Sequence, residues 1–324
     1  MPRLNVLYLP MSILDNEWGE ELVSTVSEKH QLTILEDGPI APQFENIDVV
    51  IDHGGSVGTR EMMDAAAANG VKFWQVLGTG FDHFDLDYIK SKGIPVGNCP
   101  GLFSAIPLAE TAMMYILMLA HHYRKGAENF RNEILYQPIG RELDGAVLGI
   151  LGFGASGQDL ARRAKPFGMQ IHATDIRDIE PDILDEIQPD FLSTPDDTDR
   201  ICAEADYLSV HLHLNAETRH TIDARRIGLM KPTACLINVA RGALIDEAAM
   251  YQALVDGKIG GAGLDAFVRE PPDTTEPAYQ LPNVVVTPHI AGTTTGTARR
   301  RAKCAADNCD RVAEGLEPLY RIDQ

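Results

Sequence analysis

Three charged side chains in the second half of this sequence each lie just beyond a predicted strand. Arg241 lies in the segment 237–242, Glu270 follows the segment 264–269, and His289 lies in the segment 284–292. An arginine guanidinium can bind a carboxylate through two parallel hydrogen bonds, and a carboxylate next to an imidazole stabilises its protonated form. These residue types therefore indicate an acid–base site that also binds a carboxylate, and we interpret all three as catalytic.

Each of these residues alone would more often be a solvated strand end or part of a surface ion pair. Because all three follow strands of one predicted parallel sheet, at the edge where such sheets bind ligands, their joint presence favours the catalytic interpretation. Other histidines lack that support. We expect His211 and His213 to pack near the adenine side of a nucleotide site, and the pair at 121 and 122 to end a helix.

A glycine-rich turn indicates a nucleotide site in the same domain. Gly152, Gly154 and Gly157, with Ala155 and Ser156 between them, fit the pattern GxGxxG between the apolar strand 146–151 and a predicted helix over 158–167. Glycines let a pyrophosphate approach the backbone amides at a helix N-terminus. The pattern alone is weak, since methyltransferases also have glycine-rich first turns.

The end of the next strand narrows the identity of the nucleotide. Asp175 follows the predicted strand 170–174, at the spacing after the glycines that is typical of a carboxylate binding a ribose diol. Such a carboxylate repels a 2′-phosphate, so the sequence predicts NAD(H) as the cofactor. Arg177 could accommodate the extra phosphate, and NADP(H) therefore stays open.

Short strand-like segments alternate with helical ones along the whole chain, which predicts parallel sheets covered by helices. The first third contains predicted strands at 5–9, 33–35, 48–52, 72–77 and 95–98. Prolines around the loop 99–107 mark a first crossing between domains, before a helix over 108–123. A second series of strands runs from 146–151 to 283–287, and a helix over 293–314 then returns to the first domain.

This order of elements predicts an α/β fold with two doubly wound parallel-sheet domains. A Rossmann NAD-binding domain at 104–290 is inserted into a flavodoxin-like substrate domain, which consists of 1–103 and 291–324.

Composition excludes several classes of partner. With 28 Lys+Arg against 47 Asp+Glu the formal charge is −19, which disfavours nucleic acid and anionic membranes. The apolar stretch 112–120 is shorter than the ~20 residues of a membrane span, and we interpret it as a buried helix.

The five cysteines are scattered without metal-ligand spacing, and residues 1–9 lack a signal-peptide pattern. We therefore expect free thiols, no metal site and a cytoplasmic location.

Several segments, in order, resemble the D-2-hydroxyacid dehydrogenase family, which contains phosphoglycerate dehydrogenase and glyoxylate/hydroxypyruvate reductases. The resemblance covers nearly the whole chain and rests on 78–82, 140–157, 205–214, 230–246, 257–272 and 281–292. It implies an NAD-dependent enzyme that interconverts a small 2-oxo acid and its D-2-hydroxy acid by hydride transfer. In that reaction His289 is the acid and base, Glu270 is its partner, and Arg241 binds the substrate.

The resemblance also implies the other site residues. Asp265 would bind the nicotinamide carboxamide, and further cofactor contacts are implied at Val239, Ala240, Ala291 and Gly292. The substrate would also be bound in the first domain, its carboxylate by amides around Gly54, Gly55 and Ser56, with Gly78 beside them.

The resemblance leaves the activity and the substrate open. Corepressors that resemble this family keep its fold and much of its site, so an NAD(H)-sensing binding protein is an alternative to an enzyme. A formate dehydrogenase is disfavoured, because those relatives carry glutamine where Glu270 stands. The loop 53–57 lacks the arginines of phosphoglycerate dehydrogenases, which favours an unphosphorylated substrate such as glyoxylate, hydroxypyruvate or pyruvate. By family analogy, the long segment 108–145 predicts a homodimer through the Rossmann domain.

Overall fold

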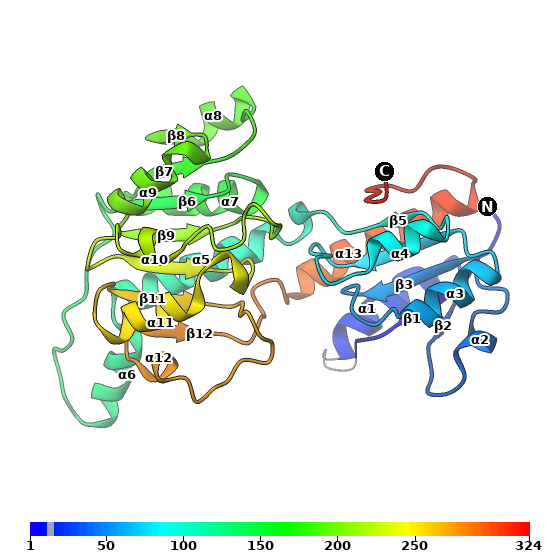
Figure 1. Ribbon diagram of the computed structural model, residues 1–324, viewed down its shortest axis with the longest axis horizontal. Helices are drawn as coiled ribbons and strands as arrows, with labels where there is room; N and C mark the ends of the chain where they lie inside the picture. The colour runs from blue at the N-terminus through cyan, green and yellow to red at the C-terminus, as the bar shows by residue number, and fades with distance from the viewer. Residues whose placement is uncertain (12–15) are drawn as a thin grey trace. The chain divides into compact units, whose positions relative to one another are not determined.

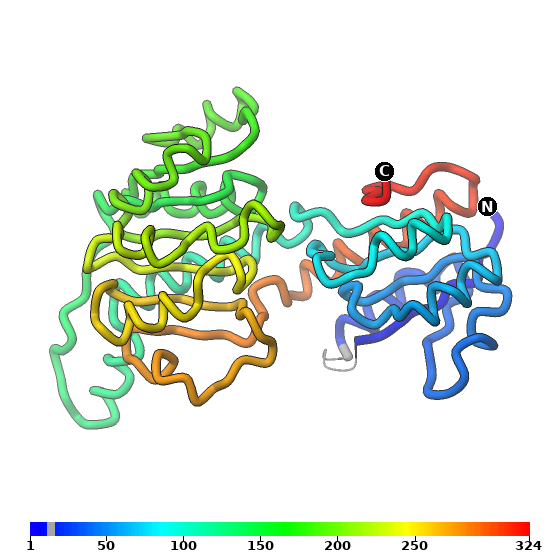
Figure 2. Tube along the Cα trace, in the orientation of Figure 1, coloured from blue at the N-terminus to red at the C-terminus, as the bar shows by residue number. Residues whose placement is uncertain are grey.

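The computed structural model describes residues 1–11 and 16–324 of the chain. In that range the chain divides into two compact units (Figures 1 and 2). The first unit comprises Met1–Phe103 together with Thr294–Gln324, and the second unit comprises Ser104–Thr293. The second unit is thus inserted into the first, and the chain returns to the first unit at residue 294.

Among the described residues, the first unit has a parallel sheet of five strands in the order β2-β1-β3-β4-β5. The strands are β1 (Asn5–Leu9), β2 (Gln31–Ile34), β3 (Val49–His53), β4 (Phe73–Leu77) and β5 (Val96–Gly97). The helices are α1 (Asn16–Ser27), α2 (Ile40–Gln43), α3 (Arg60–Ala68), α4 (Leu86–Ser91) and α13 (Thr295–Ala313). This strand order is the flavodoxin-like one.

The second unit has a parallel sheet of seven strands, all within the described residues, in the order β12-β11-β10-β9-β6-β7-β8. The strands are β6 (Val147–Leu151), β7 (Gln170–Thr174), β8 (Phe191–Ser193), β9 (Tyr207–Val210), β10 (Cys235–Asn238), β11 (Gly261–Leu264) and β12 (Val284–Val286). The helices are α5 (Ala105–Ala120), α6 (Tyr123–Arg131), α7 (Ala155–Ala164), α8 (Pro181–Ile187), α9 (Thr198–Glu204), α10 (Ala224–Ile227), α11 (Glu247–Val255) and α12 (Pro277–Gln280). This is the Rossmann order with β12 added at one edge, so the predicted fold is confirmed.

The strands that lead to the candidate site are buried on both faces, as a parallel sheet covered by helices requires. Every residue of β9, β10 and β11 is buried. The direction of the chain around the sheet reverses between β6 and β9, where Leu151 lies opposite Val210. The backbone amide of His211 donates to the Leu151 carbonyl at 2.7 Å, so the turns after these two strands begin side by side.

The apolar helix α5 begins and ends three residues earlier than the sequence pattern predicted. It includes Pro107 in its first turn, where a missing amide costs no helical hydrogen bond. His121 is its C-cap and His122 has a left-handed φ of 47°, so this histidine pair does end a helix. The expected burial holds for one face only: Tyr115 is fully buried, whereas Met114 is 39% exposed. Within residues 1–11 and 16–324, no helix is long and apolar enough to cross a membrane.

Candidate active site

The glycine-rich turn joins β6 to α7. Gly152 has a φ of +93°, and a Cβ there would lie 2.6 Å from the carbonyl oxygen of His211. A Cβ on Gly157 would lie 2.3 Å from the Gly152 oxygen. Side chains are therefore excluded at both positions. Gly154 is the N-cap of α7, so free amides of the first helical turn, which includes Ala155 and Ser156, fit an anionic pyrophosphate.

Asp175 directly follows β7 and pairs with Arg177. Its Oδ1 accepts from the Arg177 Nε at 3.0 Å, and its Oδ2 accepts from Nη2 at 3.1 Å. Burial alone would raise the pKa of Asp175, but the hydrogen bonds and the charge of Arg177 hold this pKa below its ordinary value. A Cβ on Gly154 would lie 3.4 Å from the Arg177 Nη2, so the guanidinium also borders the glycine turn.

His211, which follows β9, ties that strand to the same turn. Its Nδ1 lies 3.0 Å from the Ser156 Oγ, and its Nε2 lies 2.9 Å from the Ser209 Oγ. Desolvation lowers the pKa of His211 to about 4, so the ring is neutral at physiological pH. The sequence placed His211 near the nucleotide but gave no sign of its contact with the glycine turn. The exposed His213 makes no part of this connection.

Arg241 lies in the turn after β10, which Asn238 shapes. The Asn238 Nδ2 donates to the Arg241 carbonyl at 2.9 Å, and its Oδ1 accepts from the Ala240 amide at 3.1 Å. A Cβ on Gly242 would lie 2.0 Å from the Phe267 carbonyl carbon, so this turn packs closely on the segment after β11. Asn238 was missed by the sequence argument, although a polar residue at the end of an apolar strand was a usable signal.

Glu270 and His289 form a close pair after β11 and β12. The His289 Nδ1 lies 2.7 Å from the Glu270 Oε2, and the Glu270 Oε1 accepts from the Phe267 amide at 3.0 Å. Burial acts to raise the pKa of Glu270, but the His289 and Phe267 hydrogen bonds and the charges of His289 and Arg241 outweigh it and lower this pKa. Glu270 is therefore ionised at neutral pH, and the three predicted catalytic residues lie near one another.

Asp265 is 1% exposed and holds the segment that carries His289. Its Oδ1 accepts from the Ile290 amide and its Oδ2 accepts from the Ala291 amide, each at 2.8 Å. It also accepts from the Thr287 hydroxyl. His289 itself has a left-handed φ of 56°, which is uncommon for a residue other than glycine. The other predicted cofactor positions, Val239, Ala240 and Gly292, lie in the same two turns after β10 and β12.

The predicted substrate residues of the first unit form a separate cluster after β3 and β4. Gly54 and Gly55 both have φ of +71°, and a Cβ on Gly78 would lie 3.2 Å from the Gly54 Cα. These glycines thus allow the two turns to touch. Ser56 lies in the first of the two turns, with its Oγ 3.5 Å from the His53 carbonyl oxygen.

Asp52, the residue before His53, supports this turn and was missed by the sequence argument, which assigned it to a strand end. Its carboxylate is fully buried and accepts from the Val57 amide at 3.2 Å and the Gly58 amide at 3.1 Å. Desolvation outweighs these hydrogen bonds and raises the pKa of Asp52 to about 7.

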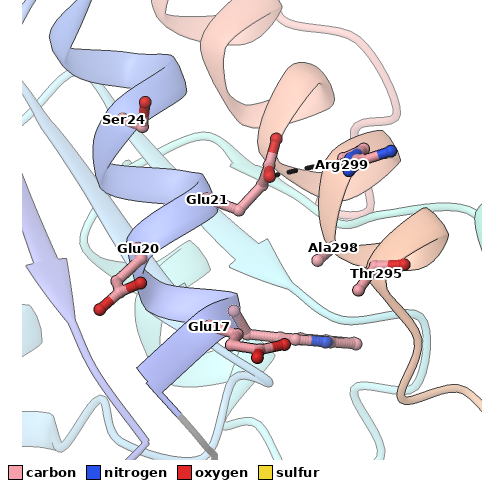
Figure 3. Close-up of a pocket in the computed structure, with 8 residues that line it drawn as sticks. Glu17, Glu20, Glu21, Ser24, Thr295, Ala298 and Arg299 are labelled. Atoms are coloured by element: carbon pink, nitrogen blue, oxygen red, sulfur yellow. Dashed lines mark ion pairs between the residues drawn. The ribbon is translucent and has the colours of Figure 1, made fainter.

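A surface hollow in the first unit lies between α1 and α13 and is lined by residues outside the predicted site (Figure 3). Glu17, Glu20 and Glu21 give it an acidic rim, on which Glu21 pairs with Arg299 at 3.9 Å. Trp18 also lines it, and the Trp18 ring stacks on His53 with 5.8 Å between ring centroids. Because the carboxylates repel an anionic acid, we do not include this hollow in the substrate site.

Known proteins match most of this chain. Residues 113–291 match the model of the D-isomer specific 2-hydroxyacid dehydrogenase family, NAD binding domain. A hydroxypyruvate reductase from Thermotoga maritima is 35% identical over 290 residues, which cover 87% of this chain and 91% of that protein.

Solved structures of similar proteins extend over almost the same length. A D-lactate dehydrogenase from Aquifex aeolicus, in complex with NAD and lactic acid, has a TM-score of 0.82 at 26% identity and covers 99% of both chains. An NADPH-dependent glyoxylate/hydroxypyruvate reductase from Sinorhizobium meliloti, in complex with NADP and malonate, also has a TM-score of 0.82, at 25% identity, over 99% of this chain and 97% of that one.

Proposed function

Because this chain belongs to the D-isomer specific 2-hydroxyacid dehydrogenase family, we propose that it is an NAD(H)-dependent enzyme that interconverts a small, unphosphorylated 2-oxo acid and its D-2-hydroxy acid. The observation that carries the proposal is the His289–Glu270 pair at 2.7 Å, close to Arg241 and in the same unit as the glycine turn. The names of the relatives make hydroxypyruvate and glyoxylate the first substrates to test.

Each residue has a defined task in this proposal. When bound on the glycine turn, NADH supplies the hydride that reduces the substrate carbonyl carbon. His289, whose Nδ1 is engaged by Glu270, donates a proton from Nε2 to the carbonyl oxygen, and in the reverse direction the neutral ring accepts it. Arg241 binds the carboxylate and polarises the carbonyl.

The first unit contributes backbone amides in this proposal, and the second unit binds the cofactor. In the first unit, the turn of Gly54, Gly55 and Ser56, supported by the buried Asp52, carries backbone amides that suit a carboxylate. In the second unit Asp175 binds the ribose diol and Asp265 reaches the nicotinamide carboxamide.

The proposal is tested by following NADH absorbance with a panel of 2-oxo acids, namely glyoxylate, hydroxypyruvate, pyruvate and the phosphorylated 3-phosphohydroxypyruvate. We expect turnover with at least one of the first three and little with the last. Tight NADH binding without turnover of any acid would identify an NAD(H)-sensing binding protein instead. Efficient use of the phosphorylated acid would contradict the proposed substrate class.

Replacing Glu270 with glutamine should move the upper pH limit of carbonyl reduction toward lower pH. Reduction requires protonated His289, and the Glu270 carboxylate 2.7 Å away favours that positive charge. Glutamine keeps the shape and removes the charge. The pH profile of kcat/KM measures this shift, under conditions where hydride transfer limits the rate.

The chain offers a matched control for this variant. His172 and Glu204 form another imidazole–carboxylate pair in the second unit, at 3.0 Å. Their pair lies away from the strand ends of the site, so Glu204→Gln should leave the pH profile unchanged. An equal shift in both variants, or none in Glu270→Gln, would reject the proposed dyad.

The cofactor should be NADH in preference to NADPH, by about tenfold or more in kcat/KM, because the Asp175 carboxylate opposes a 2′-phosphate. Arg177 neutralises part of that charge through its two hydrogen bonds. Asp175→Ala should therefore improve the use of NADPH, and Arg177→Ala should make the preference for NADH stronger. Comparable efficiency of the unmodified protein with both cofactors would contradict the assignment.

We also propose that the protein is a homodimer through its second unit. α5, the end of α7 and the segment after it present a largely apolar hollow lined by Met113, Met114, Leu117, Met118, Pro166 and Phe167, together with the charged Glu110, Arg162 and Arg163. The segment after α6 adds highly exposed apolar side chains, among them Leu135, Tyr136 and Ile139. A second copy would cover both surfaces.

Sedimentation tests the dimer directly. We expect a species of twice the 35.5 kDa chain mass, and Phe167→Glu should shift it toward the monomer. A 35.5 kDa species at micromolar concentration would exclude the dimer.

The protein's location is a separate proposal. All five cysteines are buried and free, which supports a cytoplasmic location, where thiols remain reduced.

A further inference from the structure

We infer that Tyr115 is a positioning residue for the reaction: from α5, its hydroxyl fixes the backbone that holds His289, acting through Thr287 and Asp265. The inference rests on the proposed role of His289 as the proton donor. It concerns a residue in the middle of an apolar helix, which the sequence pattern presents only as core.

Tyr115 reaches the end of β11 because a glycine lies beneath it. The residue is fully buried, and a Cβ on Gly263 would lie 2.6 Å from both the Cβ and the Cγ of Tyr115. The ring therefore packs directly against the strand, and the hydroxyl extends to its last residue. There it contacts both the Leu264 carbonyl oxygen, at 3.1 Å, and the Thr287 Oγ1, so its single proton is shared between these two acceptors.

The hydrogen bonds of this cluster have a defined direction. Thr287 has one hydroxyl proton, which it donates to the Asp265 carboxylate, so toward Tyr115 its oxygen can only accept. Asp265 accepts from the amides of Ile290 and Ala291, on the far side of His289. The Thr287 amide in turn donates to the Leu264 carbonyl at 3.0 Å. A line of donors thus runs from Tyr115 to a buried carboxylate, where such bonds are strong.

This line of hydrogen bonds matters because of the backbone it restrains. His289 has a left-handed φ of 56°. A residue with a side chain keeps this conformation only when contacts with the surrounding structure hold it in place. Its neighbours on both sides are held: the Thr287 side chain by Tyr115 and Asp265, and the next two amides by Asp265. Without the tyrosine hydroxyl, Thr287 loses a donor and the His289 ring is less firmly held beside Glu270.

The experiment compares Tyr115→Phe with Tyr207→Phe. The first variant keeps the ring on Gly263 and removes the hydroxyl. The second removes the hydroxyl of another buried tyrosine in the same apolar cluster, on β9. In Tyr115→Phe we expect kcat for carbonyl reduction to fall roughly 5- to 30-fold, since small displacements of a catalytic group reduce rates strongly. KM for the oxo acid and the Kd of NADH should change by less than about twofold, because the substitution removes no side chain that is proposed to bind the oxo acid or NADH.

A second measurement separates positioning from general loosening of the core. With NADH carrying deuterium at the transferred position, the isotope effect on kcat should rise in Tyr115→Phe, because hydride transfer becomes more nearly rate-limiting. Tyr207→Phe should leave kcat and the isotope effect unchanged. Equal behaviour of the two variants would overturn the inference.

The route through Thr287 is tested by a double-mutant cycle. In a Thr287→Val background, Tyr115→Phe should have little further effect on kcat, because the Thr287 hydroxyl, through which Tyr115 acts on Asp265, is already gone. Full additivity of the two substitutions would reject the route. If the unmodified protein turns over no faster than His289→Ala, the proposed function fails. If the unmodified protein is active and the two tyrosine variants have the same kcat, only this inference fails.

Discussion

His289→Ala should lower turnover in both directions by about 10²- to 10⁴-fold, which is the usual contribution of a positioned acid or base. Reduction loses the group that protonates the carbonyl oxygen, and oxidation loses the base that accepts the hydroxyl proton. NADH affinity should change little, because the glycine turn and Asp175 that bind the nucleotide are untouched. Stopped-flow measurement of both directions and fluorescence titration of NADH give the two quantities.

The His172–Glu204 pair again supplies the control. His172→Ala removes an imidazole that also contacts a carboxylate in the second unit, but at a position within β7. Its kcat should remain close to that of the unmodified protein. A His289→Ala variant with near-normal turnover would remove the acid–base assignment, and with it the mechanism proposed for this family member.

Arg241→Ala should raise KM for the oxo acid by about 10²-fold and also lower kcat, since one side chain both binds the carboxylate and polarises the carbonyl. Arg241→Lys should recover only part of this loss, because an ammonium keeps the charge but cannot form two parallel hydrogen bonds. Added guanidinium ion should partly restore the alanine variant. Steady-state kinetics at saturating NADH measure all three effects.

Arg269 provides the matched control for charge. It is exposed and adjacent to Glu270, so Arg269→Ala removes a positive charge nearby without removing the carboxylate-binding group. Its KM should stay within about threefold of the original. A similar rise in both variants would mean that general electrostatic attraction, and not the fork of Arg241, binds the substrate.

The fold and the grouping of Arg241, Glu270 and His289 were predictable for one physical reason. Parallel strands place their carboxyl ends at one edge of a sheet, so residues that follow β10, β11 and β12 must come together whatever the details of the turns. The glycine pattern was predictable because close approach of backbone atoms admits only glycine.

The supporting residues could not be predicted in the same way. Tyr115 and Thr287 are 172 residues apart in the sequence, and their contact depends on how α5 packs on the sheet. Asp52 looked like an ordinary strand residue, since its two amide partners lie in a turn whose shape the sequence does not specify. The bounds of α5 were missed because a proline in the first turn of a helix resembles a proline that ends a loop.

Two faces of α5 have different contacts, and this arrangement has a consequence for inhibition of the enzyme. Tyr115 contacts Thr287, in the segment that leads to His289, while the preceding residue of the helix, Met114, lines the apolar hollow with Phe167. A molecule that competes with the second copy for this hollow and tilts α5 would therefore also displace the tyrosine hydroxyl. Such a compound would act as a noncompetitive inhibitor, lowering the maximal velocity while nucleotide and acid continue to bind.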